Sequence, residues 1–121
     1  MKIKRKKKEL YMKRKRRVRK KIEGMVNKPR LSVFRSSKHI YVQAIDDING
    51  NTISSSSSLD KKIKKNVNFK KMKIAYMVGL LMGDKLKKLG IELAVFDRNG
   101  FKYKGRIIQI ANGIRRSGLI F

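Results

Sequence analysis

The sequence predicts an α+β fold. We expect a mixed sheet, made of a three-stranded antiparallel meander and a fourth parallel strand, with two helices on one face and a basic N-terminal arm. Three observations support this fold. Short strand-like runs separated by turn residues fill residues 30–57. A helical apolar period follows from Phe69 to Leu89 and again from about Tyr103 to Ser117. The first thirty residues contain sixteen Lys or Arg and only two acids.

The basic arm is expected to span residues 1–28. It has good helix formers but too few apolar residues to bury a face, and its like charges repel each other. We therefore expect it to be disordered in free solution and to become helical on a phosphate surface. Lys28-Pro29 marks the boundary, because proline disfavours helix in the residue before it. Residues 29–121 are then a single domain of ordinary length.

Three strands are predicted after this boundary, at Arg30–Arg35, His39–Ile45 and Thr52–Ser57. Residues 36–38 form the first turn. The second contains Asn49-Gly50, a pair that favours tight hairpins. The serine run in the third segment is also typical of a flexible linker. Its position after a hairpin turn favours a strand.

Alternation along the strands predicts which face of the sheet is buried. The side chains expected to meet the helices are Leu31, Val33, Ile40, Val42 and Ala44. The open face then carries Ser32, Phe34, His39, Tyr41 and Gln43. Phe34 taken alone is expected to belong to a minor core, and Tyr41 can also be read as an ordinary strand aromatic.

The remaining elements complete the sheet and its cover. The first helix should bury Ile74, Ala75, Val78, Leu81, Met82 and Leu89, with Gly79 and Gly83 letting it lie close to the sheet and Gly90 ending it. The apolar segment Glu92–Phe96 predicts a central fourth strand. The last helix should bury Ile107, Ile110, Ala111 and Ile114. Because strand–helix–strand connections give parallel neighbours, the sheet should be mixed.

Composition excludes several classes of protein. There is no cysteine, and the only histidine is His39, so disulfides, thiolate metal sites and multi-histidine centres are excluded. The longest largely apolar run, Ile74–Leu81, is less than half of the ~20 residues that a membrane span needs. We therefore expect no membrane partner, no cofactor and no small-molecule substrate.

The alternative of an enzyme rests on three carboxylates. Asp46, Asp47 and Asp97 end predicted strands and could hold Mg²⁺ for phosphodiester hydrolysis, and the strand order is similar in outline to ribonuclease-H-like nucleases. Such sites need several acids at one point. Here two of the three adjoin a turn, where aspartate is ordinary. The sequence therefore predicts a protein that is not an enzyme.

The formal net charge of +26 indicates a polyanionic partner, since like charges in this number destabilise a compact protein unless a partner neutralises them. Two clusters could bind RNA. One is the open strand face, with its aromatic side chains rimmed by Arg30, Arg35 and Lys38. The other is the segment from Asp97 to Arg106, where a strand ends and a helix begins. Each can also be a solvated basic surface or a capping turn.

The segments Pro29–Ser36, Lys38–Tyr41 with Gln43, and Ile45–Asp47 resemble bacterial-type large-subunit ribosomal protein eighteen. So do Val95–Arg98, Tyr103 with Gly105-Arg106, and the ending Arg116–Leu119 with Phe121. The likeness runs from about Arg17 to the last residue. It implies a structural protein of the large ribosomal subunit that binds 5S rRNA in the central protuberance, contacts the large-subunit rRNA and lies beside ribosomal protein five.

The resemblance also implies site residues. Those expected to face 5S rRNA are Arg30, Arg35, Ser36, Lys38, His39, Tyr41 and Gln43, together with Arg98, Tyr103 and Arg106. The arm residues expected to bind RNA are Lys13, Arg14, Arg16, Arg17, Arg19 and Lys20. Lys104 replaces the family's usual histidine and keeps a cation. Asn99 replaces a usual glycine and tolerates a left-handed turn. Ile120 replaces a residue that is often polar.

Two questions stay open at this point. A free-standing nucleoid protein or RNA chaperone would carry a similar charge. Lys, Ile and Asn, which have AT-rich codons, are abundant, and this indicates an AT-rich genome. We favour a plastid genome, with a mitochondrial or bacterial genome as the alternatives.

Overall fold

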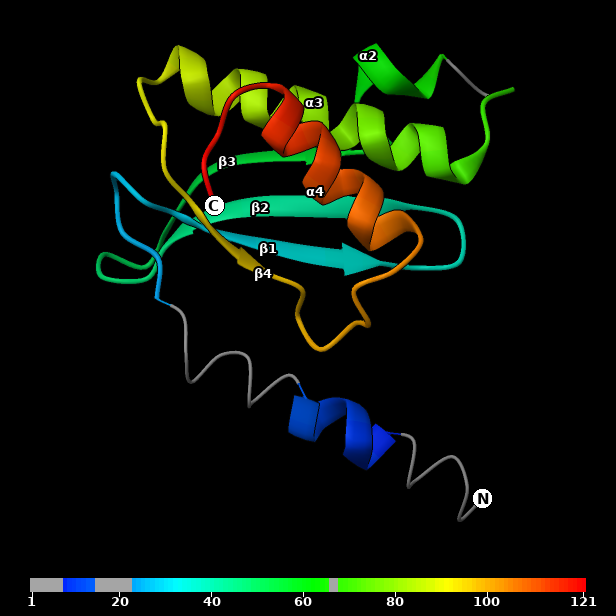
Figure 1. Cartoon of the computed structure of the whole chain (residues 1–121), viewed down its shortest axis with the longest axis horizontal. Coiled ribbons are helices and arrows are strands. Elements are labelled where there is room, and N and C mark those ends of the chain that lie inside the picture. The colour runs from blue at the N-terminus through cyan, green and yellow to red at the C-terminus, as the bar shows by residue number, and fades with distance from the viewer. Residues whose placement is uncertain (1–7, 15–22, 66–67) are drawn as a thin grey trace.

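The computed structural model describes residues 8–14, 23–65 and 68–121. A four-stranded sheet with the order β3-β2-β1-β4 lies beneath helices α3 and α4 (Figure 1). Residues 8–14 are helical and lie on the other side of the sheet. The α+β fold, with its mixed sheet and both long helices on one face, is confirmed.

The three-stranded meander is confirmed. Strands β1 (Arg30–Arg35), β2 (Ile40–Asp46) and β3 (Asn51–Ser57) pair antiparallel in sequence order, and β4 (Val95–Asp97) pairs parallel with β1. The serine run is therefore a strand and not a linker. Ser56 shows how serine fits there, because its buried hydroxyl donates to the carbonyl oxygen of Val78 at 3.0 Å.

The predicted inward face of the sheet is the core. Its five members are at most 1% exposed: Leu31, Val33, Ile40, Val42 and Ala44. They pack against α3 (Lys71–Lys88) and α4 (Arg106–Arg116). A short helix α2 (Lys61–Lys64), which the sequence did not predict, adds Ile63 to this core.

The end of α3 differs from the expectation. Leu89 is 58% exposed, and Leu86 is fully buried in its place. The helix ends at Lys88, and Gly90 adopts a φ of 78° just after it. The chain therefore turns away before the helical period can bring Leu89 back to the core.

The glycines of α3 serve a different contact from the one predicted. A Cβ atom on Gly79 would lie 2.2 Å from the carbonyl oxygen of Ile110, and one on Gly113 would lie 2.2 Å from that of Tyr76. Gly79 and Gly113 therefore let α3 approach α4, not the sheet. The buried stripe predicted for α4 is confirmed: Ile107, Ile110, Ala111 and Ile114.

The expectation of a central fourth strand was wrong, because among the described strands β4 lies at the edge of the sheet and pairs only with β1. Its apolar side chains are covered by the C-terminal residues instead. Phe96 stacks on Phe121 with ring centroids 5.5 Å apart, and the N–H of Ala94 donates to the carbonyl oxygen of Ile120 at 3.1 Å.

Candidate nucleic-acid interface

The open face of the sheet is hollowed over β1 and β2. A hollow of about 470 Å³ is lined by Ser32, Phe34, Tyr41, Gln43 and Asn99; we call it the open-face hollow. Phe34 is 51% exposed, so the expectation that it belongs to a minor core was wrong. Helices α3 and α4 cover the other face of the sheet. The ring of Phe34 therefore lies at the surface, beside the rings of Tyr41 and Phe101. Phe34 and Tyr41 have ring centroids 6.1 Å apart.

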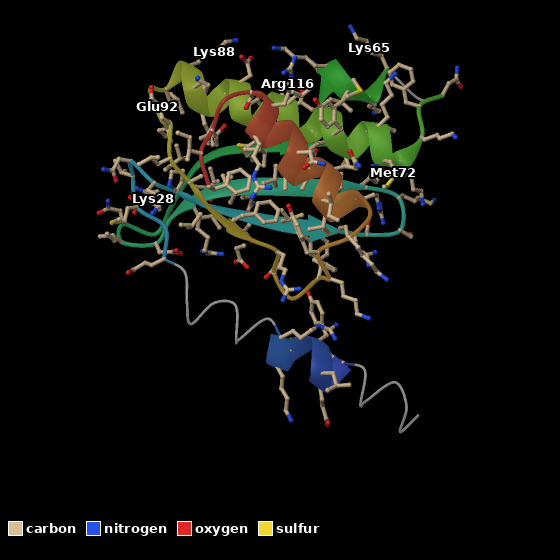
Figure 2. All side chains as sticks on the ribbon, viewed as in Figure 1. Lys28, Lys65, Met72, Lys88, Glu92 and Arg116 are labelled. Atoms are coloured by element: carbon tan, nitrogen blue, oxygen red, sulfur yellow. The ribbon has the colours of Figure 1, made fainter. Side chains whose placement is uncertain are left out.

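A second, larger groove of about 660 Å³ lies beside the start of α4, and we call it the basic groove. Its lining has six cationic and no acidic side chains: Tyr11, Arg14, Arg35, Lys71, Met72, Phe101, Lys102, Lys104, Gly105 and Arg106. Figure 2 shows Met72 at the end of the molecule where the β1–β2 turn and the start of α4 also lie.

The helical segment 8–14 supplies one wall of the basic groove. Arg14 Nε donates to the carbonyl oxygen of Gly100 at 3.1 Å, and the rings of Tyr11 and Phe101 lie 5.5 Å apart. Partial burial raises the pKa of Tyr11. Arg14 was predicted to bind RNA, but no sequence pattern indicates that Tyr11 packs on a turn ninety residues away.

A row of four aromatic rings runs from the basic groove to the open-face hollow. Tyr11 lies against Phe101, Phe101 lies 6.2 Å from Phe34, and Phe34 lies against Tyr41. Spacings of this kind are those of packed aromatic pairs. The arm, the turn before α4 and the open sheet face therefore form one continuous surface.

Two guanidinium groups approach each other at the basic groove. Arg35 lies over the Phe101 ring, with its Cζ atom 5.0 Å from the centroid, and Arg106 Nη2 donates to the carbonyl oxygen of Ser36 at 3.0 Å. Burial, and then the charge of Arg35, lower the pKa of Arg106. Like charges held together in this way favour an anion between them.

The turn between β1 and β2 is held by its own polar groups. The N–H of Ser36 donates to the carbonyl oxygen of His39 at 2.8 Å, and the Ser36 hydroxyl accepts from the N–H of His39 at 3.2 Å. The His39 ring contacts the Ser58 hydroxyl through Nδ1 at 3.0 Å. Lys38 is exposed at this turn.

Residues of the second predicted cluster are divided between two places. Arg98 donates to the carbonyl oxygen of Phe101 at 3.2 Å and so shapes the turn, and Lys104 lines the basic groove. Tyr103 instead packs on Phe96 and accepts a hydrogen bond from Arg115 at 3.3 Å, beside the β4 edge. Asn99 adopts the left-handed turn expected of it, with a φ of 56°.

Arg30 lies at the other end of β1 and is only 9% exposed. Its guanidinium binds Asp47 through Nε at 2.9 Å and Asp97 through Nη1 at 2.7 Å. Burial alone would lower the pKa of Arg30, but the hydrogen bonds and charges of the two carboxylates outweigh it and raise the pKa. This cluster joins β1, β4 and the β2–β3 turn. The structure thus places Arg30 between two carboxylates, where it is nearly buried rather than exposed at the rim of the open face.

The carboxylates considered for catalysis are engaged in structural contacts. Asp46 accepts hydrogen bonds from Asn49 and the N–H of Ile48 in its own turn, while Asp47 and Asp97 hold Arg30. The described ranges contain no group of three acidic, His or Cys side chains placed to hold a metal ion.

Of the arm residues predicted to bind RNA, Lys13 is exposed on the helical segment and Arg14 is partly buried. The other four lie outside the described residues: Arg16, Arg17, Arg19 and Lys20. In the part of the chain that the structure describes, no helix has the length and apolar character of a membrane span.

The fold and its surface define a small basic α+β protein with one sheet face covered by helices and the other carrying aromatic and basic side chains. The family model described as "Ribosomal L18 of archaea, bacteria, mitoch. and chloroplast" matches residues 5–121. The chain therefore belongs to the ribosomal L18 family.

Curated bacterial relatives agree with this assignment along nearly the whole chain. "Large ribosomal subunit protein uL18" of Thermotoga petrophila is 49% identical over 119 residues, covering 95% of each chain. The protein of the same name from Myxococcus xanthus is 46% identical over 113 residues, covering 93% of this chain and 96% of its own. That of Aster yellows phytoplasma is 49% identical over 114 residues, covering 91% of this chain and all of its own. These relatives are structural ribosomal proteins, which confirms that the chain is not an enzyme.

Proposed function

We propose that this large-subunit ribosomal protein binds 5S rRNA and helps to attach it to the large rRNA in the central protuberance, beside ribosomal protein five. The observation that carries the proposal is the continuous surface formed by the open-face hollow and the basic groove. It presents aromatic rings and cations together, and the groove lining contains no acid. Rings of this kind stack on unpaired bases, and cations neutralise the RNA backbone.

The two parts of the chain contribute different terms to binding. Residues 1–28 supply charge, which acts on any polyanion and gives most of the affinity. Residues 29–121 supply a fixed shape, and shape and base contacts are what distinguish one RNA from another. We therefore assign selection of 5S rRNA to the folded domain, and added affinity to the arm.

The site residues in this proposal follow their positions in the structure. Arg35, Lys104 and Arg106 lie at the basic groove, where they would bind phosphates. Tyr41 and Gln43 lie in the open-face hollow, where they would contact a base. The β1–β2 turn carries Ser36, Lys38 and His39, and the turn before α4 is held by Arg98. Arg30 supports this surface from inside the fold rather than by touching RNA.

The compartment is a separate part of the proposal. Abundant Lys, Ile and Asn support a plastid or another AT-rich genome, while the relatives named above are bacterial. Locating the gene, and the ribosomes with which the protein sediments, tests this part.

Equilibrium binding to 5S rRNA, with excess tRNA as competitor, tests the function. With about 6–10 phosphate contacts, affinity should fall roughly 10³–10⁵-fold between about 50 and 200 mM salt, on arithmetic taken from DNA. The complex should nevertheless survive the tRNA. A protein that coats any polyanion, such as a nucleoid protein, would lose 5S rRNA to the competitor, and that result would refute the proposal.

Tyr41 gives a sharper test of the surface. Replacing Tyr41 by Ala removes a partly exposed ring and should weaken 5S rRNA binding by about 1–3 kcal/mol if the ring stacks on a base. Tyr41→Phe keeps the ring and serves as the control. A loss of no more than a few tenths of a kcal/mol would make Tyr41 an ordinary strand aromatic.

A further inference from the structure

The open-face hollow differs in chemistry from the basic groove beside it. Its five lining residues are two rings, two amides and one hydroxyl, none of them charged. A phosphate site would call for cations, and those lie in the neighbouring groove. The hollow is therefore suited to a flat, uncharged group that can both stack and form hydrogen bonds.

The backbone fixes the positions of these side chains. Phe34 is paired directly with Tyr41, and Ser32 with Gln43, so two rings and two polar groups occupy adjacent rows of one face. Ser32 is also paired with Asp97 on β4. Asp97 Oδ1 accepts from the N–H of Asn99 at 2.8 Å, which holds Asn99 at the same rim. The rings thus occupy one row of the hollow, Gln43 the next row on β2, and Asn99 the chain that leaves β4.

The two amides have their hydrogen-bonding groups open. The described part of the chain provides no hydrogen-bond partner for the side-chain amide of Gln43 or of Asn99. Each amide offers one acceptor and a pair of donors. An amide can therefore match the adjacent donor and acceptor on the edge of a nucleobase.

We propose that the open-face hollow binds one unpaired RNA base, with Phe34 and Tyr41 stacking on it and Gln43 and Asn99 bonding to its edge. The inference rests on the proposed function, because 5S rRNA is the RNA that would supply the base. Sequence-dependent recognition of RNA mostly uses unpaired bases of this kind.

The phosphates next to this base have a place on the same surface. The ring of Phe34 lies 6.2 Å from that of Phe101, which borders the basic groove. Arg35 and Arg106 stand in that groove. A nucleotide seated in the hollow can therefore place its backbone on these two cations.

Asn99 can be tested with a mild substitution. Replacing it by Gly fits the backbone, because glycine adopts the observed φ of 56° without strain. The variant removes the amide and leaves the turn intact.

The experiment uses the full chain, 5S rRNA as the probe and four variants. Asn99→Gly and Gln43→Met each remove one amide from the hollow. Asn112→Ala removes an exposed amide from α4, outside both hollows, and is the matched control. Arg35→Gln removes a charge from the basic groove. Equal urea midpoints for all variants would show that folding is unchanged.

Each hollow variant should weaken binding about 2- to 13-fold, the range for a net hydrogen bond. The salt dependence should stay as in the wild type, because no charge is lost. Arg35→Gln should instead reduce the slope by about one. Asn112→Ala should bind as the wild type does. Ultraviolet cross-linking should attach a nucleotide to peptides that contain Phe34 or Tyr41.

Two results overturn the proposal. In one, Asn99→Gly and Gln43→Met bind 5S rRNA as tightly as the wild type. In the other, cross-links form only at the basic groove and the arm. Either result, with 5S rRNA still preferred over tRNA, leaves the proposed function standing and removes the base site. Loss of that preference in the wild type overturns both.

Discussion

Replacing Asp97 with Asn should destabilise the fold, because it removes one of two carboxylates that neutralise a buried arginine. The Asp97 side chain is fully buried and lies 2.7 Å from Nη1 of Arg30. The substitution keeps the size of the side chain, and it keeps an oxygen to accept from the N–H of Asn99. The substitution removes the negative charge and places an amide N–H group, instead of a carboxylate oxygen, next to the Arg30 guanidinium.

The magnitude follows from what remains around Arg30. Removing one partner of a buried ion pair typically costs about 3–5 kcal/mol. Arg30 keeps Asp47, which binds it through both carboxylate oxygens at 2.9 and 3.0 Å, but Asp47 is partly exposed. We therefore expect the low end, about 3 kcal/mol. That is a large share of the ~5–15 kcal/mol by which domains are stable.

Urea unfolding followed by far-ultraviolet circular dichroism measures this loss. Asp84→Asn is the matched control. It breaks an exposed pair with Lys88 at 3.3 Å, which should contribute only about 0.3–0.5 kcal/mol. If Asp97→Asn costs no more than Asp84→Asn, the buried cluster does not stabilise the fold. Mg²⁺-dependent RNA cleavage that vanishes in Asp97→Asn would contradict the structural role and restore the enzyme hypothesis.

Three further outcomes are expected. Gly79→Ala should lower stability by about 1–3 kcal/mol, because its Cβ would meet the carbonyl oxygen of Ile110 on α4, and no loss in urea unfolding would contradict the close helix contact. Slight burial alone would raise the pKa of Asp60, but hydrogen bonds from the Lys62 N–H and the Lys85 ammonium lower it. The ionised Asp60 carboxylate therefore stabilises the fold at pH values above the pKa that it has in the unfolded chain. This stabilisation disappears as the pH falls through its lower pKa in the folded protein. When the pH is lowered from about 5 to about 3, the free energy of unfolding should therefore fall less for Asp60→Asn than for the wild type. An equal fall would show that the Asp60 charge does not stabilise the fold. A peptide of residues 1–22 should gain helical circular dichroism when RNA is added, and an unchanged spectrum would refute ordering on phosphate.

The sheet was largely predictable because its signal is local. Alternation placed Val33 and Val42 inward, and a period of two leaves only one other choice of face. The same signal exposed Tyr41 and Gln43 on the opposite face. Even the unusual serine strand followed from its position after a tight turn.

The errors concern features that the local apolar pattern does not determine. The apolar residues around Phe96 indicated a strand buried between neighbours, but the chain's own C-terminal residue Phe121 covers them. Leu89 follows the helical period, yet the helix stops one residue earlier. Phe34 is exposed because the helices cover the other face of the sheet, and the residue type of Phe34 alone does not indicate which face they cover.

The candidate site was predictable in composition but not in arrangement. Residue types indicated a basic and aromatic surface. They did not indicate that Tyr11 and Arg14 of the arm reach Phe101 and Gly100, nor that Arg30 is bound by carboxylates. Opposite charges 17 and 67 residues apart leave no periodic pattern, so such pairs are found only in the folded protein.

The structure also refines the relation between the arm and the domain. Residues just before Pro29 already contact the sheet, since the N–H of Gly24 donates to Asp47 at 2.7 Å. A truncation that tests the arm alone should therefore remove residues 1–22 and keep Gly24.

The ratio of the dissociation constants for tRNA and 5S rRNA shows which part of the protein selects 5S rRNA. It should be measured at several salt concentrations for the intact protein, the truncation of residues 1–22 and Tyr41→Ala. We expect the truncation to bind both RNAs more weakly and with a flatter salt dependence, and to keep the preference for 5S rRNA. Tyr41→Ala should reduce the preference without changing the salt dependence. A preference that disappears with the arm and survives Tyr41→Ala would contradict this division of roles, because it would place the selection of 5S rRNA outside the open face of the sheet.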